Sequence, residues 1–482
     1  MAISRDFLMV SGGRVAMALI AVASIRVATS FLPPSQYGEL ALLTAVQMFC
    51  GLFLVNPVGQ HINRHTHQWW DDGTLLSRLT AYRRYILGVS IVGAVASFGV
   101  ITQQSLQQSI LVAGAMLLMV IAGTWNATSI PMLNMIGFRG VSVFLAITTA
   151  VFGLFASVIL VNWSPSATAW FCGQASGMAV GALGAGWVLR HHAQRSGHSL
   201  ESLPLLDRRT IVAYCLPLAL ATGFMWLQLS GYRFVIQAYW GLEALGFLVV
   251  GLSITGQIWA LAESLMQQFL YPLFYRRITK TDADGNQSAL SDLLNIVGPL
   301  YLVLAGVVLL GAPYILRLLA APQYADADIF VRFGVAIECC RVLGNTLSNA
   351  AQVTKKTHSM ALPYILGATV AITLMAVVGE QHLGVAWAAI VLVFAAMVMI
   401  TAMLLSMYRQ VPFTLDIRLW LAGLLAMSML SLLAFLATRP DGWIEAAGIL
   451  TIIGFIGGGI MAALLWNNAA LQRLLAVKLR EA

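Results

Sequence analysis

The chain is a series of long hydrophobic stretches separated by short polar segments. Apolar runs of about 20 residues have the length at which a helix crosses the hydrocarbon core of a bilayer. The polar segments between them are too short to fold as separate soluble domains. The pattern therefore predicts an all-α polytopic membrane protein with about fourteen transmembrane helices, at residues 7–32, 38–59, 81–102, 108–130, 140–161, 166–189, 211–238, 244–271, 293–316, 329–353, 360–379, 383–407, 417–437 and 443–466.

The basic residues of the connections are divided unequally between the two sides of the membrane. With the N-terminus in the cytoplasm, twenty of the twenty-seven Arg and Lys residues fall in cytoplasmic segments, and only Arg317 and Arg439 fall on the opposite side. An excess of Arg and Lys marks the cytoplasmic side. One helix too many or too few would have inverted every later connection and placed basic residues on both sides. The sequence therefore predicts an even number of helices with both termini in the cytoplasm.

The composition agrees with a membrane protein and argues against other classes. Hydrophobic residues make up 59% of the chain and charged residues 10%, whereas soluble domains average roughly 45–50% and 25%. The net charge of +8 does not indicate nucleic-acid binding, because the basic residues are spread over short connections. The five cysteines lie within apolar runs without metal-ligand spacing. We expect no metal, no cofactor and no nucleic acid.

The connections also argue against an enzyme. On the predicted non-cytoplasmic side they are short, and the longest lies at residues 320–328. Polytopic glycosyltransferases and polysaccharide polymerases usually build their sites on large loops at that side. The sequence also lacks a phosphate-binding G-x-x-x-x-G-K-[ST] motif, a nucleophile elbow and an H-E-x-x-H zinc motif. The chain is therefore predicted not to be an enzyme.

An internal repeat relates the first and seventh predicted helices. Residues 24–43 read S-I-R-V-A-T-S-F-L-P-P-S-Q-Y-G-E-L-A-L-L, and residues 231–250 read G-Y-R-F-V-I-Q-A-Y-W-G-L-E-A-L-G-F-L-V-V. In both, an arginine precedes the helix end by about two turns, and a glycine opens the next apolar run. Six helices separate the copies, which predicts a parallel repeat. The expected domains are a six-helix bundle at 1–200, a second at 201–411, and two extra helices at 412–482.

These two segments resemble the bundle-opening motifs of the polysaccharide-transporter family, which contains flippases for lipid-linked oligosaccharides. That family belongs to the multidrug/oligosaccharidyl-lipid/polysaccharide export superfamily. The resemblance implies a multi-pass protein of the bacterial inner membrane that moves an undecaprenyl-diphosphate-linked oligosaccharide from the cytoplasmic to the periplasmic leaflet by alternating access. It implies a role in polysaccharide, O-antigen or exopolysaccharide biosynthesis, with membrane lipids, a polysaccharide polymerase and glycosyltransferases as candidate partners.

Such a cargo carries an anionic diphosphate and many hydroxyl groups, so it requires cationic and amide side chains in a wet cavity. Charged residues within a membrane cost roughly 2.5–3.5 kcal/mol each on insertion scales and are functional candidates. Arg14, Arg26 and Arg233 lie within predicted spans, and we predict that they bind substrate. The alternatives are a structural partner for Arg14 and snorkelling to the headgroups for Arg26 and Arg233.

The tenth predicted helix carries a polar stripe. Glu338, Arg341, Asn345 and Asn349 follow the spacing of one helical face. A polar stripe across a membrane helix indicates a wet cavity or a buried interface. Arg341, Asn345 and Asn349 are predicted to bind substrate, with a glycan supplying the hydrogen-bond partners of the asparagines. The alternative is that Glu338 and Arg341 neutralise each other.

Two carboxylates within predicted spans are candidates for ion coupling. Glu263 lies in the eighth predicted helix and Glu338 in the tenth. A carboxylate held in the membrane can bind and release a proton during a transport cycle. The alternative for Glu263 is a structural ion pair with Arg233 or Arg14.

Other transport functions leave different sequence features. A cation-coupled multidrug exporter of the same superfamily is the alternative function, and it would require an aromatic and acidic cavity. The charges that we treat as membrane-embedded favour an anionic cargo, because they are five arginines and two glutamates: Arg14, Arg26, Arg233, Arg332 and Arg341 against Glu263 and Glu338. A major-facilitator exporter is disfavoured, because the loop after the second helix lacks a G-x-x-x-D-R-x-G-R pattern. The polar stripe counts against a membrane scaffold without transport activity.

Overall fold

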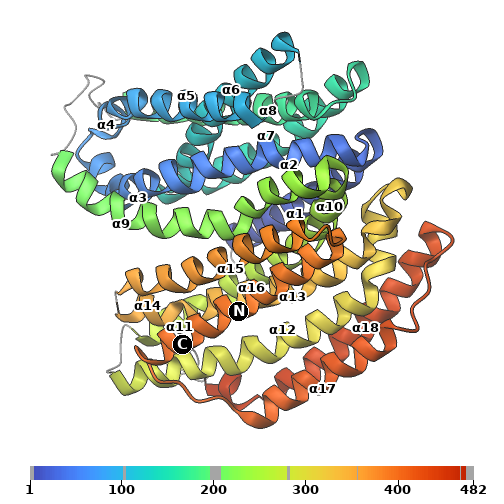
Figure 1. The fold of residues 1–482 in the computed structure, drawn as a ribbon. Coiled ribbons are helices and arrows are strands. Elements are labelled where there is room, and N and C mark those ends of the chain that lie inside the picture. Colours follow the sequence, from blue (N-terminus) through green and yellow to red (C-terminus); the bar gives the residue numbers. More distant parts are fainter. Residues whose placement is uncertain are drawn as a thin grey trace. The chain divides into compact units, whose positions relative to one another are not determined.

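The computed structural model describes residues 5–100, 105–195, 208–278, 283–354, 356–466 and 468–473. Within these ranges all regular secondary structure is helical (Figure 1). The chain forms two compact units, Met1–Phe234 and Val235–Ala482. Each unit is described by itself below.

The first unit contains nine α-helices and two π-helical segments among its described residues, and it ends within α10. Each π-helical segment continues directly from the α-helix before it, so the chain changes its helical pitch there without a loop. The elements are α1 (Arg5–Phe31), α2 (Pro34–Phe49), η1 (Cys50–Val55), α3 (Asn56–Asp71), α4 (Leu75–Ala81), α5 (Arg83–Val100), α6 (Leu106–Met135), α7 (Arg139–Trp163), α8 (Ala167–Arg195), α9 (Arg208–Trp226), η2 (Leu227–Gly231) and the start of α10 (Tyr232–Phe269).

The second unit begins within α10, which is broken at Gly241. The φ of this residue is 82°, a conformation that glycine adopts readily and other residues rarely do. The remaining elements are α11 (Tyr271–Ile278), α12 (Ala283–Leu319), η3 (Pro322–Ala327), α13 (Asp328–Leu347), α14 (Asn349–Thr354), η4 (Thr357–Met360), α15 (Ala361–Glu380), α16 (Val385–Tyr408), α17 (Ile417–Ala434) and α18 (Trp443–Trp466).

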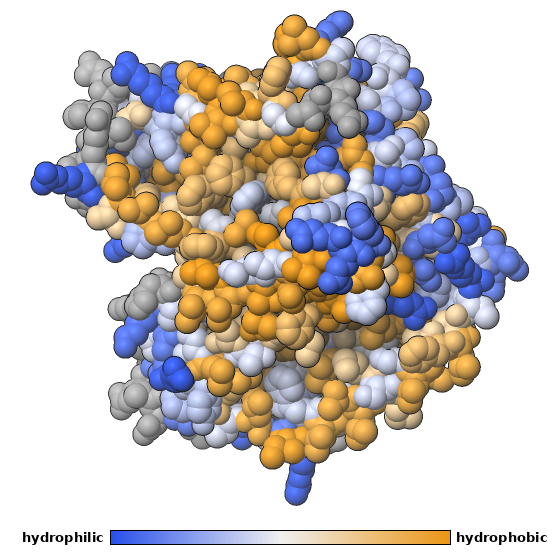
Figure 2. All heavy atoms as spheres, viewed as in Figure 1, coloured by the Kyte–Doolittle hydropathy of each residue, from blue (hydrophilic) through white to orange (hydrophobic). Residues whose placement is uncertain are grey.

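The helices have the length and composition of membrane spans. Eleven segments of the described chain are long and apolar enough to cross a membrane. Large hydrophobic side chains point outward, as at Phe455, which is 78% exposed, and hydrophobic residues cover broad areas of the visible surface in Figure 2. The chain is therefore a multi-pass membrane protein, as predicted.

The number of fourteen crossings and the cytoplasmic termini stay predictions. One of the eleven segments, Ile211–Phe269, is 59 residues long and contains the break at Gly241. Helices α8 and α13 lie at predicted spans but are not among the eleven. The predicted span at 329–353 is covered by α13 and α14, with a turn at Ser348 between them.

Close contact between α7 and α8 holds one side of the first unit together. A Cβ built on Gly177 would lie 2.5 Å from the Cα of Gly153 and 2.6 Å from the carbonyl oxygen of Thr149. Only a residue without a side chain permits such an approach, which is the usual role of small residues between membrane helices. Gly177 therefore fixes the distance between the two helices.

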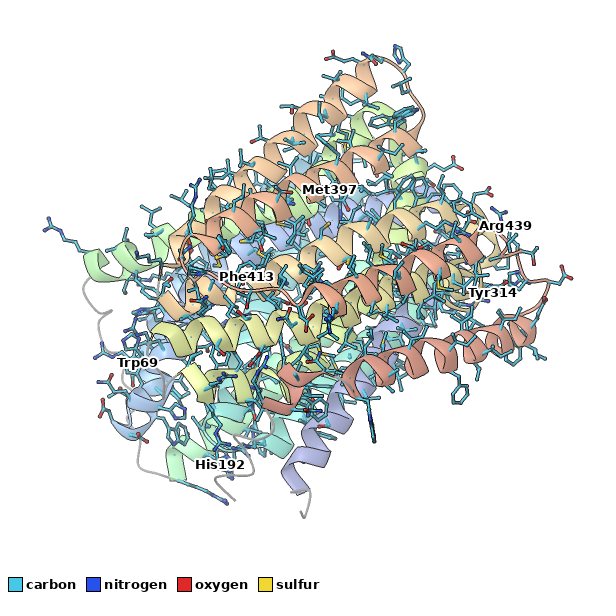
Figure 3. All side chains as sticks on the ribbon, turned by 90° about the horizontal axis from the view of Figure 1, so that it is seen from below. Trp69, His192, Tyr314, Met397, Phe413 and Arg439 are labelled. Atoms are coloured by element: carbon cyan, nitrogen blue, oxygen red, sulfur yellow. The ribbon has the colours of Figure 1, made fainter. Side chains whose placement is uncertain are left out.

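In the second unit, α17 and α18 pack on α12. Near one end of α12, Tyr314 packs with Ala446 and Ile453 of α18, and Figure 3 shows Tyr314 and Arg439 at that end, away from Phe413. Nearer the start of α12, the Asn295 amide accepts a hydrogen bond from the Trp420 indole at 3.1 Å. The predicted extra helices are thus part of this unit.

The division at Phe234 differs from the predicted domain boundary at residues 200 and 201. Helix α9 contacts α3 and η1 of the first unit, and its Trp226 indole donates to the carbonyl oxygen of Ala45 at 2.9 Å. These contacts do not test the boundaries of the predicted repeat, which stay a prediction.

Candidate functional site

An ionic cluster lies between α10 and α13 of the second unit. Arg341 of α13 donates from Nε to Glu338 Oε2 at 2.7 Å and from Nη1 to Glu263 Oε2 at 3.1 Å. The three side chains are only 18%, 15% and 13% exposed, respectively. Three residues predicted as separate candidates therefore form one site. The contact between Glu338 and Arg341 that the alternative reading expected is present. Glu263 pairs with the same arginine, where the sequence had left open a pair with Arg233 or Arg14.

Close packing of α10 against α13 brings Glu263 to Arg341. A Cβ on Gly251 of α10 would lie 2.6 Å from the Cβ of Phe330, and a Cβ on Gly334 of α13 would overlap the Thr255 hydroxyl. These two glycines let the helices approach at two neighbouring levels. The ionic contact forms farther along the same pair of helices, where longer side chains bridge the gap.

The cluster has an uneven charge balance. Two carboxylates face one guanidinium, so the fully ionised cluster carries one excess negative charge. A charge that is taken out of water needs a partner, because the cost of desolvation is several kcal/mol per ion. One proton or one monovalent cation would balance the cluster.

Amide and phenol groups extend the cluster along α13. Asn345 Nδ2 donates to Glu263 Oε1 at 2.8 Å, and the Tyr364 hydroxyl lies 3.5 Å from Asn345 Oδ1. The second carboxylate oxygen of Glu263 is therefore also occupied. The Asn345 side chain thus orients Glu263 toward Arg341.

Asn349 has a complete set of partners from the protein. Its Nδ2 donates to the Tyr271 hydroxyl at 3.3 Å and to the Thr346 carbonyl oxygen at 2.9 Å, while its Oδ1 accepts from the Tyr275 hydroxyl at 3.0 Å. Burial raises the pKa of Tyr275, which keeps this hydroxyl protonated as a donor. Asn349 is 3% exposed. The protein thus supplies the hydrogen-bond partners that the sequence had assigned to a glycan, and the substrate-binding roles of Asn345 and Asn349 stay predictions.

The other three predicted arginines lie in the first unit. Arg14 is an exposed residue of α1, and Arg26 is half-buried in the same helix. Arg233, at the start of α10, donates from Nη1 to the carbonyl oxygen of Ala41 at 3.0 Å. Its Nε is buried and has no hydrogen-bond partner among the described residues. The roles of all three in substrate binding stay predictions.

An amide-lined pocket of about 410 Å³ in the first unit was not predicted. Gln47, Asn56, Gln60 and Asn63 line it, together with Asn126 of α6. Asn63 Oδ1 is buried without a hydrogen-bond partner among the described residues. The spacing of Asn56, Gln60 and Asn63 places them on one face of α3, so this amide stripe was readable in the sequence. The π-helical segment η1, which precedes α3, could not be read from the sequence.

Within the described residues, no group of three or more His, Cys, Asp or Glu side chains could hold a metal ion.

No protein-family model and no curated protein matches the chain. Solved structures do match it. The lipid II flippase MurJ in an inward closed conformation superposes with a TM-score of 0.72 at 12% identity, over 96% of this chain and 98% of that one.

Multidrug transporters match over a smaller share of the chain. An outward-facing MATE family transporter of the MOP superfamily has a TM-score of 0.50 at 15% identity, over 88% of this chain and 96% of that one. A eukaryotic MATE transporter has a TM-score of 0.50 at 12% identity, over 89% and 98%. The structural neighbours are thus transporters and not enzymes. The chain therefore shares its fold with these transporters.

Proposed function

We propose that this chain is a flippase of the bacterial inner membrane that moves an undecaprenyl-diphosphate-linked oligosaccharide from the cytoplasmic to the periplasmic leaflet. The observation that carries the proposal is the structural match to a lipid II flippase over 96% of the chain. The pathway would be polysaccharide, O-antigen or exopolysaccharide biosynthesis. A polymerase and glycosyltransferases of that pathway would be its partners.

The proposed topology has fourteen membrane helices with both termini in the cytoplasm. Helices α8 and α13 would add two crossings to the eleven apolar segments, and the break at Gly241 would divide the longest segment into two. The charged residues Glu338 and Arg341 of α13 belong to the ionic cluster. Their ion pairs within the unit offset the cost of placing these charges in the membrane. The two six-helix repeats would be the halves of an alternating-access transporter.

The chemistry of the side chains suits an anionic glycolipid. Guanidinium groups bind phosphate oxygens with charge-assisted hydrogen bonds, and Arg14, Arg26, Arg233 and Arg341 are the cations proposed for this role. Amide side chains offer both donors and acceptors, which matches the hydroxyl groups of a sugar. The pocket around Asn63 is the proposed amide surface for the glycan, because its buried acceptor lacks a partner in the protein.

The ionic cluster is the proposed coupling element. Arg341 is held by two carboxylates, so it is not free to bind a phosphate while both remain ionised. Binding of a proton or a monovalent cation at Glu263 or Glu338 would weaken this hold. The guanidinium would then be released toward the substrate, which links cation binding to substrate binding through one side chain.

Leaflet-resolved measurement of the lipid-linked oligosaccharide in cells depleted of the protein tests the proposal. Complementation would use the wild type, Arg14→Ala, Arg341→Ala and, as a matched control, Arg84→Ala at equal expression. Intermediates are expected to accumulate on the cytoplasmic face, and the wild type and the control are expected to clear them. If the intermediates cross normally without the protein, the flippase proposal fails and the multidrug-exporter alternative replaces it.

A further inference from the structure

A second hollow of the first unit lies away from the amide-lined pocket. It is a groove of about 1050 Å³ between the α4–α5 segment, α6 and α8. Most of the residues that line it are apolar, among them Leu79, Leu118 and Leu183. Leu183 is 75% exposed and Trp187 is 67% exposed. In a membrane, such an open apolar groove would be accessible to lipid chains.

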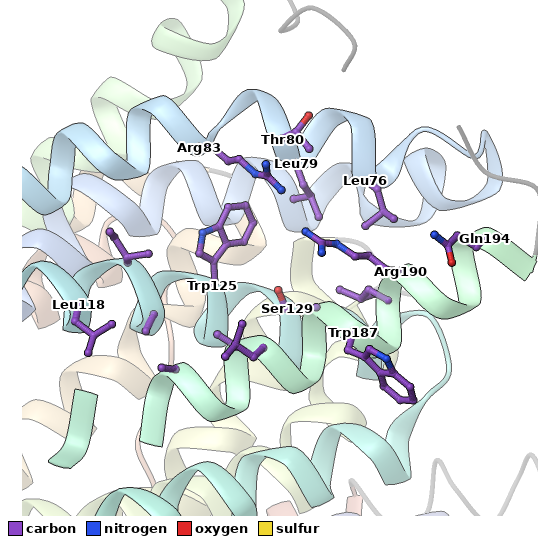
Figure 4. Close-up of a pocket in the computed structure, with 17 residues that line it drawn as sticks. Leu76, Leu79, Thr80, Arg83, Leu118, Trp125, Ser129, Trp187, Arg190 and Gln194 are labelled. Carbon is purple, nitrogen blue, oxygen red and sulfur yellow. The ribbon is translucent and has the colours of Figure 1, made fainter. Parts of the chain in front are cut away.

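One end of the groove is cationic. Arg83, the first residue of α5, and Arg190, near the end of α8, both line it. Figure 4 shows both guanidinium groups extending into the space between the helices, on the same side of Trp125 as Thr80 and Leu79. Neither arginine has an ion pair or a side-chain hydrogen bond within the described residues. None of the described residues that line the groove is acidic.

Two cations that have no ion pair among the described residues lie beside an apolar groove. They are complementary to one kind of molecule, an anionic headgroup attached to a hydrocarbon chain. Basic pockets between membrane helices on the cytoplasmic side bind anionic lipid headgroups. Arg83 and Arg190 both belong to the segments that the charge distribution predicts to face the cytoplasm. Polar groups of Thr80 and Gln194 lie at the same groove and can bind the remaining headgroup atoms.

We propose that this groove is a binding site for an anionic glycerophospholipid of the cytoplasmic leaflet. Its phosphate is held between Arg83 and Arg190, and one acyl chain lies along the leucines of α4, α6 and α8. The lipid bridges α5 and α8, so it acts as a resident component of the first unit. This site goes beyond the proposed flippase function, because it lies on a different groove from the amide-lined pocket and requires no transport.

The test measures lipid binding to the purified full-length protein after removal of its native lipids. Phosphatidylglycerol and phosphatidylcholine with the same acyl chains are titrated in turn, and bound lipid is counted by native mass spectrometry. The variants are Arg83→Gln, Arg190→Gln and the double substitution, with Arg84→Gln as the matched control. Arg84 is exposed and does not line the groove.

A further variant, Gly186→Trp, blocks the groove without changing its charge. A Cβ built on Gly186 meets no atom within 4 Å, so Gly186→Trp fills the groove from α8 without a clash at its first atom. This variant is informative even if an arginine substitution alters folding. Thermal unfolding of each variant without lipid shows whether the unit is intact.

The wild type is expected to prefer phosphatidylglycerol. Each arginine substitution should weaken its binding about fivefold, and the double substitution about 25-fold. Gly186→Trp should abolish the preference, while Arg84→Gln should leave it unchanged. Equal binding of both lipids by the wild type, or an unchanged affinity in the double variant or in Gly186→Trp, would overturn the proposal. Flipping activity that survives in the double variant would leave the flippase proposal standing by itself.

Discussion

Substitution of Arg341 by Gln is expected to destabilise the second unit strongly, because it removes the only positive charge seen in the described cluster. The guanidinium contacts Glu338 at 2.7 Å and Glu263 at 3.1 Å. Both carboxylates would remain at their positions between α10 and α13 and would face each other without a cation. Glutamine has a similar length but carries no charge.

The size of the effect follows from burial. At an effective dielectric constant of 20, Coulomb's law gives roughly 5–6 kcal/mol for an ion pair at these distances, and desolvation offsets part of it. Removing one partner of a buried pair costs about 3–5 kcal/mol, since an uncompensated charge remains. The exposed pair of Arg439 and Asp326, which are 57% and 83% exposed, gives the contrast. There, Arg439→Gln should cost less than about 1 kcal/mol.

Reversible unfolding in mixed detergent and lipid micelles measures both variants. The decisive arm is the triple variant Arg341→Met, Glu263→Gln, Glu338→Gln, which removes all three charges at similar volume. It should recover most of the lost free energy of unfolding, because the penalty in Arg341→Gln arises from the orphaned carboxylates. If Arg341→Gln and Arg439→Gln have equal small effects, or if the triple variant is less stable than Arg341→Gln, the argument from charge burial is refuted.

Three further substitutions test other parts of the structure. Gly177→Ala should lower the free energy of unfolding by about 1–3 kcal/mol, because the added Cβ meets backbone atoms of α7. The control, Gly186→Ala in the same helix, should be neutral in the same unfolding assay. Asp292→Asn should speed tryptic cleavage at Arg473, because the 2.6 Å contact of Arg473 with this buried carboxylate is weakened, and equal cleavage rates would contradict this. Asn63→Ala should leave the melting temperature unchanged or raise it, since an unpaired buried acceptor costs about 1–3 kcal/mol. The same substitution should slow flipping. A lowered melting temperature with normal flipping would show a purely structural role.

The helical fold could be predicted because it depends on local sequence. Long apolar runs leave a helix as the structure that satisfies the backbone in a bilayer, and the structure confirms an all-helical, multi-pass chain. The contact of Glu338 with Arg341 was also accessible, because residues three apart meet on a helix. Both predictions needed only the periodicity of one segment.

Contacts between distant segments could not be predicted in the same way. Glu263 reaches Arg341 across 78 residues of sequence, and this depends on how closely Gly251 and Gly334 let two helices pack. Two partners of Asn349 are tyrosines of α11, a short helix that begins where the predicted span at 244–271 ends. The packing of α9 with the first unit likewise depends on tertiary contacts such as the one between Trp226 and Ala45.

The central claim is that the chain moves an anionic glycolipid between leaflets, and reconstitution tests it most directly. The full-length protein is placed in vesicles with an undecaprenyl-diphosphate-linked oligosaccharide, and a membrane-impermeant glycosidase is added outside. The account predicts that the glycan of the inner leaflet becomes accessible with wild-type protein and remains protected with Arg341→Ala and in empty vesicles. Continued protection of the inner-leaflet glycan in vesicles that contain folded wild-type protein, under an imposed proton or sodium gradient of either direction, would contradict the account.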